Sequence, residues 1–221
     1  MKVYETGSIR NVVLLGHGGA GKTTIAEALA YVTSGINRMG SVDDGNTLSD
    51  FDKEEKKRKF SISTSVIPIE YKGESGELKM NILDTPGYFD FVGEVEEAVS
   101  AADAAIIVVN GKAGIEPGTV RAWELCEANA LPRLFFVTNM DDDKASYREL
   151  LLRLESRFGK RVAPLHLPIR ENEKFVGFVN VVKMKGRRFE VNSAEYTDSD
   201  IPDYSEHNLK IAREALLEAV A

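Results

Sequence analysis

The stretch from Gly16 to Thr23, Gly-His-Gly-Gly-Ala-Gly-Lys-Thr, constrains the fold of this chain more than any other feature. It fits the pattern G-x-x-x-x-G-K-[ST] and lies between the apolar run 12–15 and a helical pattern that begins near Thr23. Glycines in such a loop let several backbone N–H groups converge on one anion beside the N-terminus of a helix. A glycine-rich turn that binds nothing explains the full pattern poorly in this setting. The stretch therefore predicts nucleoside triphosphate binding.

Two side chains of this stretch suit the outer phosphates. Lys22 supplies a positive charge, and Thr23 offers a hydroxyl that can ligate the Mg2+ that bridges the phosphates. The candidate nucleotide-binding residues of the stretch are His17, Gly18, Gly19, Ala20, Gly21, Lys22, Thr23 and Thr24.

Composition and charge exclude several classes of protein. The chain has 221 residues and a formal net charge of -7, which argues against broad coating of DNA but permits a local basic patch that touches RNA. The single Cys126 cannot form an internal disulfide, and the three scattered histidines have no zinc-ligand spacing. No apolar run approaches the roughly 20 residues of a membrane span, and the first residues have no secretory character. We expect a monomeric, cytoplasmic protein that binds neither DNA nor membrane.

The hydrophobic pattern indicates an α/β fold. Short apolar runs at 12–15, 104–109 and 134–137 are typical of parallel strands, and helical patterns at 25–30, 95–102 and 147–158 are interleaved with them. The runs 62–71 and 78–83 are joined by a short polar segment and read as an antiparallel hairpin. We expect a mostly parallel sheet with one antiparallel edge strand and helices on both faces.

The alternation of strands and helices ends near residue 162. Candidate strands at 162–167, 175–183 and 187–191 follow one another without a helix between them, and a polar segment at 193–203 precedes a final helix from about Ser205. The apolar stripe of that helix is unfinished at Ala221, which is typical of a piece of a longer protein; a helix that docks on the core is the alternative.

Two further segments suit a nucleotide switch. Asp84-Thr85-Pro86-Gly87 closes the run 78–83, so that the Asp84 carboxylate can hold a Mg2+-bound water and the Gly87 N–H can reach the terminal phosphate. The same letters also favour a simple turn. Segment 35–59 has few large apolar residues and a dense charge run, which is typical of a solvated, partly disordered loop. Such a segment can be ordered by the γ-phosphate and Mg2+, with Ser61 as the contacting residue.

A third element follows the run 134–137. In Thr138-Asn139-Met140-Asp141 the carboxylate can accept two hydrogen bonds from guanine, and adenine offers no donor at those positions. Charged hydrogen bonds contribute about 1.5 to 3 kcal/mol each, so this element would favour GTP over ATP. Asp141, Asp142 and Asp143 could instead cap the next helix, and a P-loop protein that uses ATP is the corresponding alternative.

The three elements in this order, with Asp-Thr-Pro-Gly-Tyr-Phe-Asp-Phe at 84–91, resemble the GTPase domain of the bacterial elongation factor G family. Segments 111–118, 123–124, 132–133 and 162–185 extend the resemblance over nearly the whole chain. Three short segments, at 18–19, 49–52 and 58–62, look closer to the elongation factor G-like paralogues than to elongation factor G itself, the ribosomal translocase. Release factor three and the tetracycline-resistance ribosomal protection proteins share the general motifs.

The resemblance implies a P-loop GTPase core at 1–161 and a small inserted α+β subdomain at 162–221, cut within its last helix. The last guanine-binding loop of the family has no convincing match, because Ser193-Ala194-Glu195 fits it by letters but lies in the subdomain. The implied ligands are Mg2+, held by Thr23, Ser61 and Asp84, and GTP or GDP. The implied partner is the ribosome, through its large-subunit RNA.

This chain departs from the family pattern at several positions. Gly19 replaces an aspartate, Ser61 replaces a threonine, and Tyr88 stands where the family has its catalytic histidine. Tyrosine stays neutral at physiological pH, so Tyr88, the candidate catalytic residue, can orient water but cannot act as a cation. We therefore expect a slow GTPase of the translation-factor type. The alternatives are a GTP-gated ribosome-binding or regulatory module with little hydrolysis and a protein like the ribosomal protection proteins.

The guanine element also departs from the family's Asn-Lys-x-Asp, because Thr138 stands in place of the asparagine and Asn139 in place of the lysine. A register shifted by one residue would restore the asparagine as Asn139 and place the acid at Asp142. We prefer Thr138, Asn139 and Asp141 as the guanine-binding residues, because Phe136-Val137 and Ala145 then fall where the family has the same residues.

Overall fold

The computed structural model describes residues 2–73, 76–172, 174–190 and 196–220. They form two compact units, residues 1–138 and residues 139–221, and each unit is described by itself.

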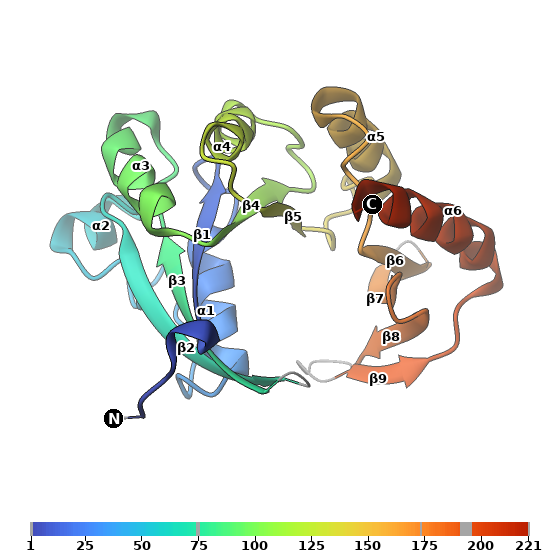
Figure 1. The fold of residues 1–221 in the computed structure, drawn as a ribbon, viewed down its shortest axis with the longest axis horizontal. Helices are drawn as coiled ribbons and strands as arrows, with labels where there is room; N and C mark the ends of the chain where they lie inside the picture. The colour runs from blue at the N-terminus through green and yellow to red at the C-terminus, as the bar shows by residue number, and fades with distance from the viewer. Residues whose placement is uncertain (1, 74–75, 173, 191–195, 221) are drawn as a thin grey trace. The chain divides into compact units, whose positions relative to one another are not determined.

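A five-stranded sheet forms the centre of the first unit (Figure 1). The strand order is β2 (Ser65–Gly73), β3 (Gly76–Asp84), β1 (Ile9–Gly16), β4 (Ala104–Asn110) and β5 (Arg133–Thr138). Strand β1 runs parallel to β3 and β4, β4 runs parallel to β5, and only β2 is antiparallel to its neighbour among these described strands. The predicted parallel sheet with an antiparallel hairpin at its edge is confirmed.

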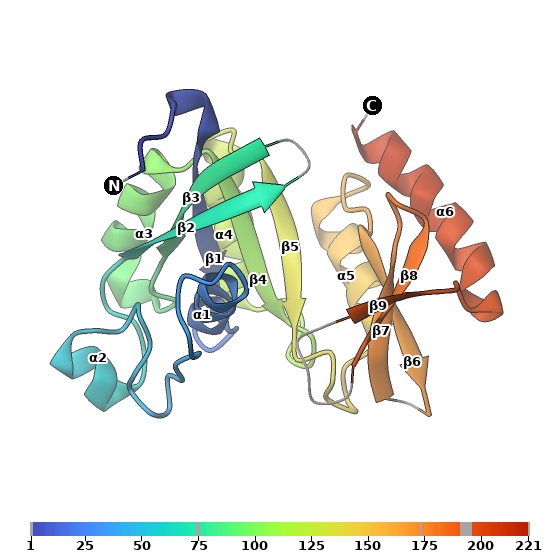
Figure 2. The same cartoon turned by 90° about the horizontal axis from the view of Figure 1, so that it is seen from below.

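Helices cover both faces of this sheet (Figure 2). Helix α1 (Lys22–Val32) lies on one face, where its Ile25 and Ala26 pack with Leu14 of β1 and Ile82 of β3. Helices α3 (Val92–Ala101) and α4 (Pro117–Ala128) lie on the other face. Side chains alternate between the two faces along each strand, and the helices on both sides therefore require apolar residues on both faces of the central strands. Each buried aliphatic side chain contributes about 1.5–3 kcal/mol to the free energy of unfolding.

Two helices of the first unit lack a clear apolar stripe, and the sequence patterns did not indicate them. Helix α4 begins with Pro117 as its first residue, and its buried positions are small or polar residues such as Gly118, Thr119 and Ala122. Helix α2 (Lys53–Arg58) is a short charged helix within segment 35–59, with Asp52 as N-cap and Glu55 closing a capping box. Short 3-10 turns are η1 (Thr6–Ser8) and η2 (Phe89–Phe91).

The second unit combines two helices with an antiparallel sheet. Helix α5 (Tyr147–Phe158) has the predicted bounds, with a Ser146 N-cap and Gly159 at its C-terminus. The sheet has the order β6 (His166–Glu171), β7 (Lys174–Asn180), β8 (Lys185–Phe189) and β9 (Tyr196–Ser199), and helix α6 (Asp203–Val220) follows. Its core contains Leu167, Ile169, Val179, Val181, Leu209 and Ala212.

The strand bounds of this unit differ from the prediction in two places. The first strand begins at His166 rather than at 162, because the apolar Val162 packs in a turn after Gly159. Strand β9 lies within the segment predicted as a polar connection, since its pairing with β8 needs no apolar side chains. Ser193-Ala194-Glu195 lie outside the described residues, and the core–subdomain boundary at 161/162 stays a prediction. Across the described ranges, no helix is both long enough and apolar enough to cross a bilayer.

Candidate nucleotide and magnesium site

The phosphate loop connects the buried strand β1 to helix α1. Gly19 and Gly21 have left-handed φ values of 77° and 100°, and Gly21 is the N-cap of α1. These conformations are costly for residues with a side chain, and they turn successive N–H groups toward the loop interior. The predicted anion cradle therefore has the backbone geometry that its sequence requires.

Lys22 is buried at the first turn of α1. Its Nζ donates hydrogen bonds to the carbonyl oxygens of Gly16, at 3.1 Å, and His17, at 3.0 Å. Burial lowers the pKa of the ammonium to about 8, while the carboxylates of Asp84 and Glu116 act in the opposite direction. An anion bound in the loop would raise the pKa of Lys22 again, because its negative charge lies near the buried ammonium and offsets the effect of burial.

A cluster of hydroxyls and carboxylates lies beside Lys22. The Thr23 hydroxyl donates to Asp84 Oδ2 at 2.8 Å, and the Thr23 and Ser61 hydroxyl oxygens are 3.3 Å apart. The Ser61 hydroxyl donates to Asp50 Oδ1 at 2.7 Å. The structure thus brings together the three predicted metal-binding residues, which come from α1, from the end of β3 and from the segment before β2. It adds Asp50, which the sequence analysis did not single out.

The two carboxylates of this cluster are almost fully buried, at 1% exposure for Asp84 and 2% for Asp50. Burial raises the pKa of Asp84 to about 6, opposed by hydrogen bonding and by the charge of Lys22. Burial also raises the pKa of Asp50, opposed first by the Ser61 hydrogen bond. Asp84 Oδ1 and Asp50 Oδ2 accept no hydrogen bond of good geometry from the described residues, although the nearby hydroxyls of Ser49 and Thr47 act to lower the pKa of Asp84 and Asp50, respectively. Buried oxygens of this kind are suited to a hard cation and its water ligands.

These residues fit Mg2+ rather than a metal held entirely by protein. No group of three or more His, Cys, Asp or Glu side chains in the described part of the chain could hold a metal ion. Magnesium usually keeps several waters and takes its other ligands from phosphates and one or two protein oxygens. A hydroxyl pair with two buried carboxylates beside a phosphate loop meets that requirement.

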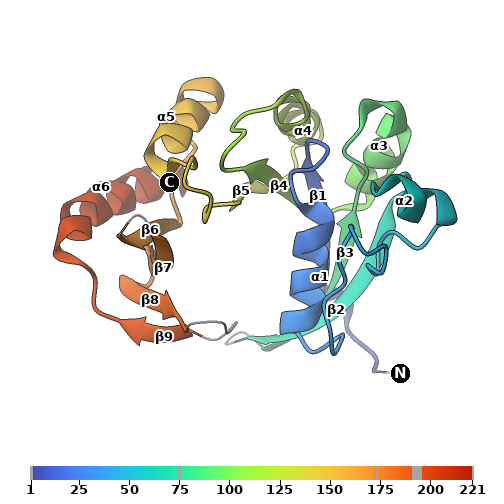
Figure 3. The same cartoon turned by 180° about the vertical axis from the view of Figure 1, so that it is seen from behind.

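Segment 35–64 packs against α1 and differs from the predicted solvated loop (Figure 3). Glu27 of α1, only 1% exposed, accepts hydrogen bonds from the backbone N–H groups of Gly40, at 2.8 Å, and Leu48. Glu55 of α2, 2% exposed, accepts from the N–H groups of Ile62 and Ser63 at 2.9 and 3.1 Å. Buried carboxylates thus hold the segment where apolar contacts are missing. The polar composition of the segment therefore wrongly indicated a solvated loop.

The loop after β3 lies against the phosphate loop. Thr85 donates its hydroxyl proton to Leu14 O of β1 at 2.6 Å. A Cβ on Gly87 would lie 2.6 Å from Gly18 Cα and 2.7 Å from Gly18 N, so only glycine permits this approach of the two loops. The γ-phosphate contact of Gly87 stays a prediction.

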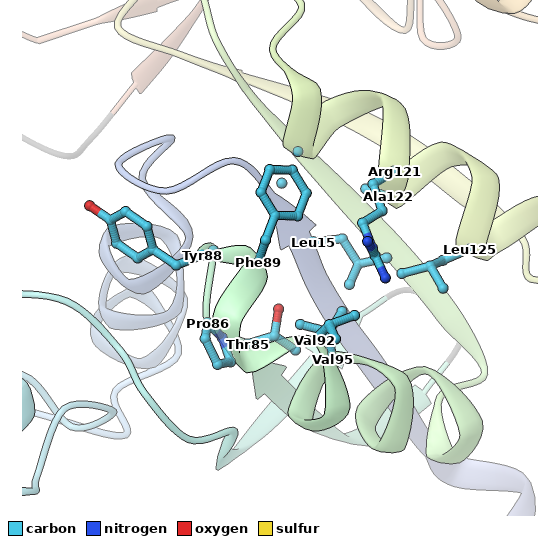
Figure 4. A pocket seen from close by; sticks show the side chains of 13 residues that line it. Leu15, Thr85, Pro86, Tyr88, Phe89, Val92, Val95, Arg121, Ala122 and Leu125 are labelled. Atoms are coloured by element: carbon cyan, nitrogen blue, oxygen red, sulfur yellow. The ribbon is translucent and has the colours of Figure 1, made fainter.

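Tyr88 and Phe89 leave this loop in different directions (Figure 4). The Phe89 ring lies over the Arg121 guanidinium at 5.7 Å, at an apolar cleft between α3 and α4 that Leu15 and Val92 also line. Tyr88 points toward the phosphate loop and is 47% exposed. Only Tyr88 is therefore placed near the expected phosphates.

The remaining loop residues have separate roles. The His17 ring points to the start of α4, where its Nδ1 accepts from the Gly118 N–H at 3.3 Å, so its backbone rather than its ring lies at the loop. Ala20 is buried, and its carbonyl accepts the hydroxyl proton of Thr138 at 2.8 Å. Thr24 is exposed on α1.

The guanine element is divided between the two units. Thr138 ends β5 in the first unit and is tied to the phosphate loop by its bond to Ala20. Asn139 and Asp141 belong to the second unit, where Asp141 is exposed and Asn139 has a left-handed φ of 54°. Asp142 Oδ1 accepts from the Lys144 N–H at 2.9 Å and so stabilises the following turn. The N-cap of the following helix α5 is Ser146, so Asp142 does not cap that helix, and the preferred register, with Asp141, stays a prediction.

Comparison with known proteins was made with this geometry in hand. The elongation factor Tu GTP binding domain family matches residues 7–220. An elongation factor G-like protein of Mycobacterium tuberculosis (strain ATCC 25618 / H37Rv) is 41% identical over 162 residues, 73% of this chain and 22% of that protein. A mitochondrial ribosome-releasing factor 2 of Anopheles gambiae is 38% identical over 174 residues, 79% of this chain and 23% of that protein.

Two further matches cover nearly all of the chain. Elongation factor G of Thermotoga sp. (strain RQ2) is 33% identical over 100% of this chain and 31% of its own length. A crystal structure of a Thermus thermophilus protein superimposes with a TM-score of 0.89 and 38% identity, over 96% of this chain and 31% of that one. The chain spans between 22% and 31% of the length of these relatives.

Proposed function

The chain belongs to the family defined by the elongation factor Tu GTP binding domain, and we propose that it binds GTP with Mg2+ and hydrolyses it as the switch of a translation factor that acts on the ribosome. One observation carries this proposal: Thr23 and Asp84 meet at 2.8 Å beside a phosphate loop, and Asp84 is only 1% exposed. A buried carboxylate next to a hydroxyl and a phosphate loop suits a hydrated metal beside phosphates.

The chemistry assigned to the residues follows from their positions. The N–H groups of residues 17–24 and the Lys22 ammonium hold the outer phosphates, and the Gly87 N–H contacts the γ-phosphate. When bound, Mg2+ supplies positive charge to the phosphate oxygens, with Thr23, Ser61 and Asp84 as the residues that hold it and its waters. Tyr88 orients the water that attacks the γ-phosphorus in line. Most of the rate gain in such reactions comes from positioning and charge stabilisation.

Guanine selection is assigned to Thr138, Asn139 and Asp141. The Asp141 carboxylate accepts hydrogen bonds from the base, which excludes adenine, and Thr138 holds the end of β5 to the phosphate loop. The hydrogen bond that Asp142 Oδ1 accepts from the Lys144 N–H engages this carboxylate in the local turn and supports this register over the shifted one.

The proposed partner is the ribosome, contacted at its large-subunit RNA by a monomeric, cytoplasmic factor. Relatives named elongation factor G and ribosome-releasing factor 2 support this partner. We assign residues 1–161 to the GTPase core and residues 162–221 to a subdomain inserted in it.

Single-turnover release of phosphate from GTP, measured on the full-length chain with and without ribosomes, tests the enzymatic proposal. We expect slow release that ribosomes accelerate, and its loss in Lys22→Ala. Two charged hydrogen bonds from the Lys22 ammonium to phosphate oxygens would contribute about 3 to 6 kcal/mol to the free energy of binding. Lys22→Ala should therefore also weaken GDP binding at least about a hundredfold. The exposed Lys160→Ala is the matched control and should retain both properties. Absence of phosphate release under both conditions would reject the GTPase assignment.

A second candidate function is a GTP-gated binding module with little hydrolysis. A phenol, Tyr88, at the position of the family's histidine favours it. If Tyr88→His creates hydrolysis where the unaltered chain has none, while GTP-dependent ribosome binding is unchanged, this candidate replaces the first.

A further inference from the structure

Both helices of the second unit pack on the same face of its antiparallel sheet. Leu209 of α6 and Tyr147 of α5 contact the apolar cluster that includes Val179 of β7. Side chains alternate between the two faces of a strand, so Phe178, next to Val179, points to the other face. The pairing register places Arg187 of β8 opposite Phe178. The sheet therefore has a second face, which lies away from α5 and α6.

Aromatic rings gather on this second face. The centroid of the Phe189 ring lies 5.9 Å from that of Phe178 and 5.7 Å from that of Phe175. The register places Tyr196 of β9 opposite Phe189 of β8. Phe189 and Tyr196 are 42% and 48% exposed. Apolar rings that gather on an exposed surface commonly mark a binding site.

Positive charge lies on the same strands. Segment 183–188, Lys-Met-Lys-Gly-Arg-Arg, is strongly basic in a chain whose formal net charge is -7. The Arg187 guanidinium lies 4.3 Å from the centroid of the Tyr196 ring. Lys185 and Arg187 contact Asp198 at 3.6 and 3.5 Å, and the Lys185 and Asp198 side chains are 62% and 57% exposed. Ion pairs this exposed are weak, so the phosphate of a ligand can replace Asp198.

We propose that Phe178, Lys185, Arg187, Phe189 and Tyr196, which we call the aromatic face, bind single-stranded RNA. Bases stack on the Phe189 ring and on the plane of Arg187 and Tyr196, and phosphates contact Lys185 and Arg187. Unpaired bases can stack on aromatic rings and guanidinium planes, whereas the bases of a duplex are stacked on each other. This inference goes beyond the proposed function, because the aromatic face takes no part in GTP binding or hydrolysis.

The order of residues along β8 favours RNA over a protein partner. Lys185, Arg187 and Phe189 occupy every second position of the strand and so share one face. Cations and a ring thus lie in a row, and an RNA strand likewise offers phosphates and bases along its length. The centres of protein–protein interfaces are depleted in lysine. The local basic patch that the net charge permits is therefore found on this sheet.

Fluorescence anisotropy with a labelled single-stranded oligouridine, measured on the full-length chain with GDP and Mg2+, tests the stacking. We expect the unaltered chain to bind, and Phe189→Ala and Tyr196→Ala each to weaken binding about five- to hundredfold. Tyr196→Phe keeps the ring and should bind like the unaltered chain. The matched control is Tyr71→Ala on β2, where the side chain is 49% exposed, and it should have no effect.

Three results of this titration would overturn the proposal. The first is no binding by the unaltered chain, and the second is an equal loss in Tyr71→Ala. The third is full affinity in Phe189→Leu, which keeps an apolar side chain without a ring, because a general apolar contact of the kind a protein partner makes would then explain the surface. Circular dichroism and GDP affinity, unchanged in each variant, show that the fold is intact.

The salt dependence of the same binding tests the phosphate contacts. Loss of one phosphate contact lowers the slope of log affinity against log salt by about 0.7 for a single strand. We expect this change in Lys185→Ala and none in the exposed control Lys160→Ala. Equal slopes in the two variants, or a duplex RNA that binds as tightly as the single strand, would contradict the proposed binding mode. Neither measurement involves hydrolysis, so failure of the GTPase assignment would leave this test unaffected.

Discussion

Replacing Asp84 by asparagine should stabilise the nucleotide-free, magnesium-free protein at neutral pH. Asp84 is 1% exposed, and one of its oxygens accepts no hydrogen bond from the described residues. An asparagine can still accept the Thr23 hydroxyl proton but has no charge to desolvate. The change thus removes a buried charge that Lys22 and hydrogen bonds compensate only in part, and buried charge of this kind is a recognised source of large stability differences.

The size and pH dependence of this effect follow from the pKa of Asp84, which burial raises from 3.8 to about 6. Each pH unit of difference corresponds to about 1.4 kcal/mol, so the full effect of ionisation is about 3 kcal/mol. Between about pH 4 and 6 the folded chain binds more protons at this site than the unfolded chain, so the free energy of unfolding falls as pH rises through that window. Below pH 4 this penalty is absent, and above pH 6 it is complete.

Urea unfolding at pH 4 to 8, followed by circular dichroism without Mg2+ or nucleotide, measures this effect. We expect Asp84→Asn to match the unaltered chain near pH 4 and to exceed it by about 2 to 3 kcal/mol at pH 7 to 8. Asp90→Asn, at an exposed carboxylate on the same loop, should show no such difference. With GDP and Mg2+ at 100 times the dissociation constant, the unaltered chain should gain about 2.7 kcal/mol and the variant much less. A destabilised variant at pH 7, or a difference that does not change with pH, would refute the reasoning.

Three further variants test other parts of the site. Tyr88→Phe should lower single-turnover phosphate release on ribosomes about ten- to hundredfold, because it removes the hydroxyl that orients water; an unchanged rate would exclude that role. Asp141→Asn should abolish the preference for GTP over ATP in competition for a fluorescent analogue, while Asp142→Asn should retain it; the reverse result would show that the guanine register is shifted. Glu27→Ala should weaken hydrogen-exchange protection in segment 38–50 by about 1 to 2 kcal/mol, because it leaves the partly buried N–H groups of Gly40 and Leu48 without their acceptor. The exposed Glu124→Ala should not weaken it, and equal protection in the two variants would argue against the Glu27 contacts.

Local patterns were sufficient for much of the fold. The apolar runs and glycine positions predicted the parallel strands, the hairpin edge and the phosphate loop, because these features depend on residues close together in the chain. Helix α5 was also predictable, since Ser146, Gly159 and the apolar spacing between them are all local signals. Helix α2 had such a signal too, the Asp52 and Glu55 capping box, but the surrounding charge run favoured a loop.

The site was only partly predictable. The sequence named Thr23, Ser61 and Asp84, because motifs with known spacing contain them. It did not reveal Asp50 as a fourth member of the cluster, because nothing in a charged segment distinguishes an acid that is buried from one that is solvated. The same applies to Glu27, whose hydrogen-bond partners Gly40 and Leu48 lie 13 and 21 residues away.

The amino-acid sequence by itself determined the anion-binding loop, the parallel strands with their hairpin edge and the family to which the chain belongs, since backbone conformation and hydrophobic spacing are encoded locally. Only the tertiary structure decided which carboxylates lose water and which side chains lie against the phosphate loop. Burial and steric room are set by residues distant in sequence, as Tyr88 is from Gly18, and they exist only once the strands have brought those residues together.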